Sequence, residues 1–170
     1  KDLFESMFPS NSVSPLPVGV LLQNIKNGNS ESEYFHLFGD PMMKLPIPSQ
    51  NVSINSISPD TLRTLGVGSF FGNTNITSTE SFGSVTLFDA ERHVTRNYLI
   101  NSQPESLSYR LPGAALFRGQ FSYQGNTFSG QIRVPQDISY SSQPAKMLIY
   151  IHDNTQDAIG SYEDISIIGG

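Results

Sequence analysis

Cysteine and tryptophan are absent from the chain, and only 15% of its residues are charged. Without cysteine the sequence holds no disulfide, no thiolate metal ligand and no cysteine nucleophile. The longest apolar run, residues 16–22, is interrupted by Pro17 and is far shorter than the about 20 residues that a membrane-spanning helix needs. The net charge is -5, and the ten basic residues are scattered rather than gathered in a stripe. A nucleic acid is therefore not expected as a partner.

The N-terminal residues also lack the apolar stretch of a signal peptide, because Lys1 is followed at once by Asp2 and Glu5. We expect the sequence to be a piece excised from a longer protein. Hydrophobic residues make up 37% of its 170 residues. Serine, asparagine, threonine and glycine take the place of the alanine, glutamate, lysine and leucine that helices favour. The composition therefore predicts a turn-rich β protein.

The first 48 residues differ in pattern from the rest. Residues 18–25 have apolar spacing compatible with a helix, and residues 34–38 predict a short apolar strand. Gly39-Asp40-Pro41 is expected to close that strand with a turn, since glycine permits unusual φ angles, aspartate accepts bonds from following N–H groups and proline fixes φ. We expect residues 1–48 to be a short mixed α/β segment with a linker, followed by one domain over residues 49–170.

Period-two alternation begins near Gln50 and predicts eight short strands, with turn signals at 124–126, 135–137 and 153–155. The predicted strands are 51–57, 63–71, 83–89, 94–99, 114–123, 127–134, 147–153 and 164–168. Such spacing is typical of an antiparallel β-sandwich, and we expect an immunoglobulin-like one. The side chains expected in its core are Phe70, Phe82, Phe88, Phe117, Phe121, Phe128, Ile132, Leu148 and Tyr150.

Several segments carry a family resemblance. Residues 35–41 resemble the Leu-x-Gly-Asp-Pro segment that closes the caspase-like domain of gingipain-type cysteine peptidases. Other segments are similar to one branch of that family, the type IX secretion sortases of PorU type. These segments are 83–89, 116–119, 134–140, 157–160 and the terminal Gly169-Gly170. The likeness extends from about residue 16 to the end of the chain.

The resemblance implies that residues 1–48 are the C-terminal remnant of a peptidase domain and that residues 49–170 are its immunoglobulin-like neighbour. In that family the catalytic cysteine and histidine lie upstream, so no catalytic residue and no cofactor are expected in this chain. The parent protein would be a cysteine-type endopeptidase that processes C-terminal signals, exported to the bacterial outer membrane or cell surface. Its implied partners are the upstream peptidase domain and, beyond it, secretion-system proteins or cargo.

The residues of these segments are predicted to have structural roles. Pro135 should end a strand where no ladder donor is needed. Asp137 should cap the following turn, and Tyr140 should be half buried beside the core. A loop that steers substrate toward the peptidase is the functional alternative for the same segment. The residues singled out in this way are Gly39, Asp40, Pro41, Arg118, Gly119, Pro135, Asp137, Tyr140, Asp157 and Gly160.

Asp153 and Asp157 are the candidate metal ligands, because closely spaced carboxylates suit calcium. A glycine at the sixth position and a glutamate at the twelfth are missing, so a solvated hairpin turn is the favoured interpretation. His36, His93 and His152 are far apart in sequence and are interpreted as isolated strand histidines.

An adhesion or carbohydrate-binding module of a bacterial surface protein is the alternative function. Exposed aromatic side chains in a row on one sheet would favour it, and the absence of tryptophan argues against it.

Overall fold

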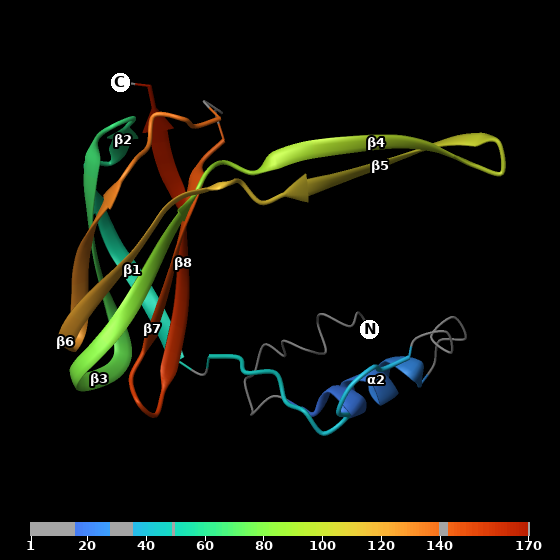
Figure 1. Ribbon diagram of the computed structural model, residues 1–170, viewed down its shortest axis with the longest axis horizontal. Coiled ribbons are helices and arrows are strands. Elements are labelled where there is room, and N and C mark those ends of the chain that lie inside the picture. The colour runs from blue at the N-terminus through green and yellow to red at the C-terminus, as the bar shows by residue number, and fades with distance from the viewer. Residues whose placement is uncertain (1–15, 28–35, 49, 140–142, 170) are drawn as a thin grey trace. The chain divides into compact units, whose positions relative to one another are not determined.

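The computed structural model describes residues 16–27, 36–48, 50–139 and 143–169. The chain divides into two units, Lys1–Ser49 and Gln50–Gly170 (Figure 1). In the first unit, α2 (Val18–Lys26) forms where apolar spacing predicted a helix. The assignment of residues 1–48 to a peptidase domain stays a prediction.

The strand predicted over residues 34–38 is wrong for the part that the structure describes, because residues 36–38 form no ladder. Phe38 is 96% exposed rather than packed. A strand needs a neighbour for its backbone groups, and the bridge found in this unit joins Pro17 to Lys44 instead. The apolar composition of the segment therefore did not lead to a strand.

The second unit is mainly β and forms a barrel-like sandwich (Figure 1). Its strands are β1 (Gln50–Ser58), β2 (Thr61–Arg63), β3 (Val67–Phe88), β4 (Arg92–Ile100), β5 (Gln103–Leu111), β6 (Ala115–Arg133), β7 (Ala145–His152) and β8 (Asp157–Ile168). A six-stranded sheet has the order β1-β3-β7-β8-β2, with β6 paired to β3, while β4 and β5 form a sheet of two. The strands β2 and β5 were not predicted.

Two long strands, β3 and β6, each span both layers. The first half of β3 pairs with β1 and β6, and its second half pairs with β6 and β7. The predicted strands 63–71 and 83–89 are therefore parts of one strand region, and 114–123 and 127–134 are parts of another. The turn predicted at 124–126 is wrong, since Gly125, at a φ of 76°, lies within β6. Gly125 thus adopts a positive φ at an irregular position within a continuous strand.

The side chains that face the core change parity along β3. Even-numbered positions such as Phe70 and Ile76 are buried in the first half, and odd-numbered positions such as Val85 and Leu87 in the second. The register against β6 shifts twice between Asn73 and Ser81. The shifts leave extra residues in β3 at the bend. Because side chains alternate with period two, these extra residues change which positions face the core, from even-numbered before the bend to odd-numbered after it.

This change of parity corrects part of the predicted core. Phe70, Phe128 and Ile132 are buried as predicted, and Phe117 and Phe121 pack against them. Phe82 is instead 54% exposed, and Phe88 is only half-buried. On β7 the buried side chains are Met147, Ile149 and Ile151, so Leu148 and Tyr150 lie on the opposite face. Since almost every residue of β7 is apolar, its sequence alone did not distinguish the two faces.

Aromatic rings packed on glycines hold β3 against β6. Three glycines of this ladder lie opposite a phenylalanine: Gly72 opposite Phe128, Gly83 opposite Phe121, and Gly130 opposite Phe70. In each pair, a Cβ on the glycine would come within 2.4 Å of the ring. The three rings also contact one another, with centroids 5.5 to 6.3 Å apart. The bare glycine backbone thus provides the space that the rings fill.

The last strand closes the sandwich by parallel pairing, which corrects the expectation of a purely antiparallel one. β8 pairs in parallel with β1 at Gln50↔Ala158 and with β2 from Thr61↔Ser166. Its other edge pairs antiparallel with β7. The first and last strands of the domain therefore lie side by side, although they are far apart in sequence.

Two hydroxyl groups are buried at paired positions of β3 and β6. Among the described residues, neither Ser81 Oγ nor Tyr123 OH has a partner at hydrogen-bond distance. Burial raises the pKa of Tyr123 above its ordinary value of 10.0; the neighbouring Ser81 hydroxyl offsets part of this rise, and the Asp153 carboxylate adds to it. An acid whose folded-state pKa is raised contributes stability that is present below its unfolded pKa and lost as the pH rises above it.

Replacing Tyr123 with phenylalanine should therefore weaken the alkaline loss of stability. We expect the free energy of unfolding, measured with urea, to fall less between about pH 9 and about pH 11 in Tyr123→Phe than in the wild type. Near pH 7 the variant should be within about 1 kcal/mol of the wild type, because the hydroxyl it removes is unsatisfied. Tyr98→Phe, on the exposed strand β4, is the matched control and should keep the wild-type pH dependence. Equal alkaline losses in all three proteins would contradict the argument.

Candidate functional site

The Gly39-Asp40-Pro41 segment forms a turn that folds back on α2. Gly39 has a φ of 145°, which favours glycine, and Asp40 Oδ1 accepts a bond of 2.8 Å from the N–H of Met42. The carbonyl of Pro41 accepts a bond of 2.9 Å from the N–H of Gly19 at the start of the helix. The turn therefore has the local geometry predicted from its residues, and its groups serve to hold the helix.

The segments 83–89 and 134–140 meet through the side chain of Asp89. Its Oδ2 accepts a bond of 2.7 Å from the N–H of Ser139, and its Oδ1 accepts one of 2.8 Å from Ala90. The capping role predicted for Asp137 stays a prediction, because the turn that follows it continues outside the described residues; its carboxylate is exposed. Asp89 ties the described part of the loop, because it lies at the end of β3 next to that loop.

The remaining residues singled out from the sequence are placed as follows. Pro135 comes two residues after the end of β6, as predicted, and Tyr140 lies outside the described residues. Gly119 lies under the ring of Phe117, where a Cβ would be 2.8 Å from the ring. Arg118 is exposed and has no polar partner among the described residues.

Gly160 marks the place where β1 crosses β8. A Cβ on this residue would lie 2.0 Å from the carbonyl oxygen of Val52, which is closer than any side chain allows. Glycine is therefore required where these two backbones meet. The crossing lies directly beyond the parallel pair Asn51↔Ile159.

The predicted turn after β7 is present, and its carboxylates are used within it. Asp153 Oδ1 accepts bonds of 2.7 Å from the N–H groups of both Thr155 and Gln156. These backbone bonds hold the pKa of Asp153 below its usual range. Asp157 Oδ2 accepts a bond of 3.2 Å from the hydroxyl of Tyr150. Among the described residues, no group of three histidine, aspartate or glutamate side chains is arranged to hold a metal ion.

Three rings form a row on the outer face of the sheet, where β3 pairs with β7. The centroid of His152 lies 6.4 Å from that of its register partner Phe82 and 5.7 Å from that of Tyr150. We call Phe82, Tyr150 and His152 the aromatic row. Together with Ser84 and Gln120 they line a depression of about 340 Å³. Partial burial raises the pKa of Tyr150, and the charge of Asp157 adds to the effect.

The two-stranded sheet of β4 and β5 is an amphipathic ribbon. One face combines Thr95 and Ser108, whose hydroxyl oxygens lie 2.9 Å apart, with other polar side chains and with Leu99 and Pro104 near the tip. The opposite face carries the side chains that we call the apolar ribbon face: Val94, Tyr98, Ile100, Leu107, Tyr109 and Leu111. Leu107 is 52% exposed and Ile100 51%. Within the described part of the chain, β4 and β5 pair with each other and with no further strand.

The ribbon was missed by the sequence analysis because β5 was not predicted. Its alternation of Leu107, Tyr109 and Leu111 with polar residues is a strand signal that could have found it. Pro104 and Glu105, which strands disfavour, obscured that signal. The pairing with β4 then follows from the short connection between the two segments.

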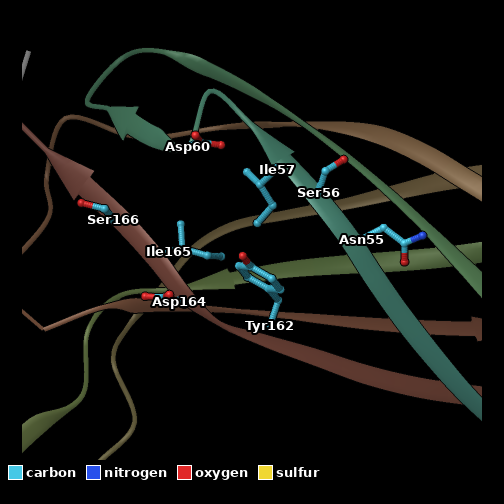
Figure 2. A pocket seen from close by; sticks show the side chains of 8 residues that line it. All are labelled: Asn55, Ser56, Ile57, Asp60, Tyr162, Asp164, Ile165 and Ser166. Carbon is cyan, nitrogen blue, oxygen red and sulfur yellow. The ribbon is translucent and has the colours of Figure 1, made fainter.

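A cleft of about 400 Å³ lies between β1 and β8, and we call it the seam cleft (Figure 2). Ile57 of β1 and Ile165 of β8 point toward each other at its floor, and the ring of Tyr162 projects into it (Figure 2). Asp60 and Asp164 lie along its border. The sequence analysis did not anticipate this cleft, because its two walls are about 100 residues apart along the chain.

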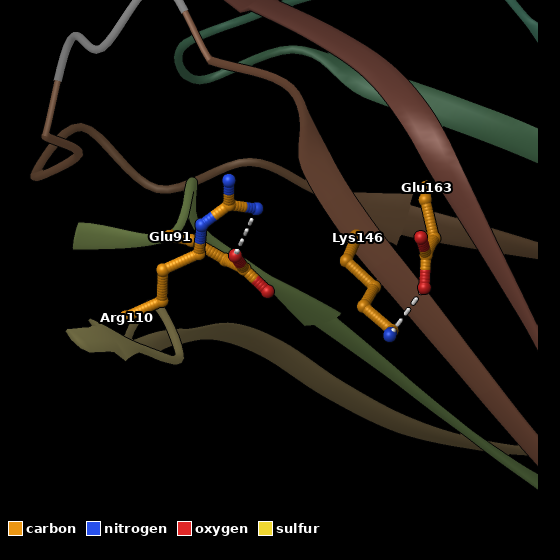
Figure 3. Close-up of polar contacts among 4 residues, drawn as sticks. All are labelled: Glu91, Arg110, Lys146 and Glu163. Carbon is orange, nitrogen blue, oxygen red and sulfur yellow. Dashed lines mark hydrogen bonds and ion pairs between the residues drawn. The ribbon is translucent and has the colours of Figure 1, made fainter. Parts of the chain in front are cut away.

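Two ion pairs lie on the surface (Figure 3). Glu91, just before β4, lies 3.8 Å from Arg110 of β5, and Lys146 of β7 donates to Glu163 of β8. All four side chains are largely in solvent, so each pair stabilises the fold by at most about 1 kcal/mol. They connect neighbouring segments of the sheets, and we assign them no role in binding or catalysis.

The three histidines lie on separate parts of the chain, with His36 in an irregular segment, His93 on β4 and His152 on β7. The strand placement expected for His36 is therefore wrong. Among the described residues, no helix is long and apolar enough to cross a membrane.

The requirement for glycine at position 160 can be tested by Gly160→Ala. The added Cβ collides with the Val52 carbonyl, so we expect the free energy of unfolding to fall by about 1–3 kcal/mol. The matched control is Ser161→Ala, a change at the next and exposed residue of β8, which should stay within about 0.5 kcal/mol of the wild type. Equal midpoints of urea unfolding for both variants would show that the crossing relaxes without cost.

Comparison with known proteins gives distant structural likeness alone. No family model matches the chain, and no curated protein matches its sequence. Spo0M, a sporulation control protein from Bacillus subtilis, is similar in structure with 8% identity and a TM-score of 0.35, over 71% of this chain and 50% of Spo0M. The CARDB domain of the PF1109 protein from Pyrococcus furiosus, solved with di-metal ions, has 9% identity and a TM-score of 0.24, over 73% of this chain and 99% of the domain. The chain thus spans about half the length of Spo0M, and at these TM-scores neither likeness carries an argument.

Proposed function

We propose that this chain is a non-catalytic positioning domain of a gingipain-like cysteine peptidase of PorU type, exported to the bacterial surface and concerned with type IX secretion and C-terminal signal processing. The proposal rests on the resemblance and is supported by what the matching residues do. Asp89 ties the loop at Ser139, Gly160 permits a backbone crossing and Asp40 closes a turn. All three serve the scaffold.

The finer fold assignment belongs to the same proposal. We take the sandwich to be an immunoglobulin-like arrangement in which β3 and β6 pass from one layer to the other. Strands that change sheets at bends and bulges are a known way of joining two layers. The size of the unit, Gln50–Gly170, suits a domain of this class.

The observation that carries the positioning function is the apolar ribbon face. A two-stranded hairpin is at best marginally stable in water on its own. Here most of the exposed apolar side chains, those of Tyr98, Ile100, Leu107 and Leu111, lie on one face of the ribbon, and Leu99 lies on the other. A partner that covers this face would bury several large side chains at once, as interfaces do.

The charge of the ribbon indicates what the partner surface should carry. β4 and β5 contain three arginines and one glutamate, a net charge of +2 in a chain of net charge -5. Arg92 and Arg96 lie on the same face as Ile100 and Leu107, together with Glu105, so this face carries two positive charges and one negative charge. The face therefore fits an apolar surface bordered by carboxylates, which we assign to the upstream peptidase domain of the parent protein.

A carbohydrate-binding function is the second candidate, and the aromatic row favours it. Phe82 is 54% exposed and His152 is also exposed, so their rings are accessible on one sheet face. Hydrogen-bonding groups of Gln120, Ser84 and Tyr150 line the same depression. Rings that pack on apolar faces beside polar groups that fix orientation are the general composition of small-ligand sites.

The positioning function predicts that the apolar ribbon face binds the peptidase domain. We expect the double variant Ile100→Ser, Leu107→Ser to bind that domain at least about tenfold more weakly, because two anchoring side chains are lost. Surface plasmon resonance with the separately expressed peptidase domain measures the affinity. The matched control is Asn97→Ser, Ser106→Ala on the opposite face of the ribbon, which should bind as the wild type does.

Both double variants should unfold at the wild-type temperature, since the altered side chains are exposed. Equal affinities of the two double variants would remove the ribbon from the interface. Turnover of arginine- or lysine-containing peptides by the chain alone would contradict the non-catalytic assignment.

The carbohydrate function predicts that Phe82→Ala weakens binding of bacterial surface oligosaccharides by about three- to tenfold, because a stacking ring is lost. Chemical-shift titration measures the affinity and locates the contact. Phe71→Ala removes a 44% exposed phenylalanine from the other half of β3 and should leave binding unchanged. Absence of any shift around Tyr150 and His152 with the wild type would exclude this candidate.

A further inference from the structure

The two walls of the seam cleft are strand edges that face each other. β1 and β8 pair at Gln50↔Ala158 and Asn51↔Ile159 and then separate. β8 pairs again only from Thr61↔Ser166, with β2. Between these two places, β1 is bonded to β3 and β8 to β7, each along its other edge. Among the described residues, no ladder is formed along the edges that border the cleft.

These edges are only partly protected against pairing. β1 contains no charged residue and no proline, and residues 160–165 of β8 contain no lysine or proline but do carry Glu163 and Asp164. Each strand also has one register irregularity, between Ile54 and Ser56 of β1 and opposite Ala145 and Met147 in β8. Unpaired N–H and C=O groups on such an edge accept a further strand. The unpaired part of β8 is about 20 Å long at roughly 3.3 Å per residue, which suits an extended segment of about six residues.

The side chains that line the cleft indicate which kind of side chain a bound strand should carry. Ile57 and Ile165, which are 8% and 1% exposed, provide an apolar floor. Asp60 and Asp164 border the cleft, and in the described part of the chain neither carboxylate has an ion-pair or hydrogen-bond partner. The volume of about 400 Å³ falls within the range of ligand sites. Two unpaired carboxylates beside an apolar floor complement a long basic side chain with an aliphatic stem.

We propose that the seam cleft binds an extended peptide segment carrying a lysine or arginine, which adds as a strand to the free edges of β1 and β8. Backbone hydrogen bonds hold the segment, as in other cases of strand addition. Asp60 and Asp164 select the basic side chain. The proposal depends on neither the family resemblance nor the ribbon, so its failure would leave the proposed function untouched.

Calorimetric titration of the full chain with synthetic peptides tests the proposal. The probe is a short peptide of alternating threonine and valine with a central lysine. We expect it to bind, and we expect the double variant Asp60→Asn, Asp164→Asn to bind it about five- to tenfold more weakly. Asp137→Asn removes an exposed carboxylate elsewhere and is the matched control, with wild-type affinity. Hydrogen exchange should show protection of amides in residues 53–58 and 161–165 when the peptide is bound.

Two further peptides separate the backbone contribution from the charge contribution. A peptide with glutamate in place of lysine should bind worse than the lysine peptide. A lysine peptide with prolines at alternate positions should not bind, because it lacks the N–H donors of a strand. Equal binding of all three peptides, or no binding of the first, overturns the proposal. A concentration-dependent dimer in analytical ultracentrifugation that the lysine peptide does not dissociate would assign the cleft to a second copy of the chain and overturn it as well.

Discussion

The ladder between β3 and β6 is the constraint on which the β domain depends. It runs from Val67↔Arg133 to Phe88↔Ala115 and passes through both layers of the sandwich. Phenylalanine rings lie over bare glycine backbone at three of its pairs, so neither strand can shift by one residue without a collision or a void. Each buried ring contributes about 2–3 kcal/mol of transfer free energy. β1 and β7 then attach to the two halves of β3, and the remaining strands follow from them.

The same ladder determines where functional surfaces can lie. Because β3 changes parity at its bend, Phe82 faces solvent beside His152 instead of entering the core. The aromatic row is thus a direct consequence of the extra residues between Asn73 and Ser81. The seam cleft has a different origin, since β1 and β8 are each fixed to another strand and, among the described residues, pair with each other only at Gln50↔Ala158 and Asn51↔Ile159, beside the close approach at Gly160.

Two of the segments on which the proposed family assignment rests contain structural joints. Asp89 joins the end of β3 to the loop after β6, and the turn at Asp40 holds the start of α2. Such residues stabilise the fold, so their presence indicates a fold rather than a particular reaction. The surfaces that remain free for a partner are formed by residues outside these segments, namely the apolar ribbon face, the aromatic row and the seam cleft.

The sequence by itself determined the features that depend on residues close together along the chain, namely strand alternation and turns. Its composition and alternation predicted a β domain, the residues at 39–41 predicted a turn in which Asp40 accepts a bond from a following N–H, and those at 153–155 predicted a turn. Only the tertiary structure decided which face of β7 is buried, that 63–71 and 83–89 belong to one strand region, and that β8 closes on β1 in parallel. Those outcomes depend on bulges and on partners far along the chain. The period of side chains along a strand carries no information on which of its two faces another layer will cover.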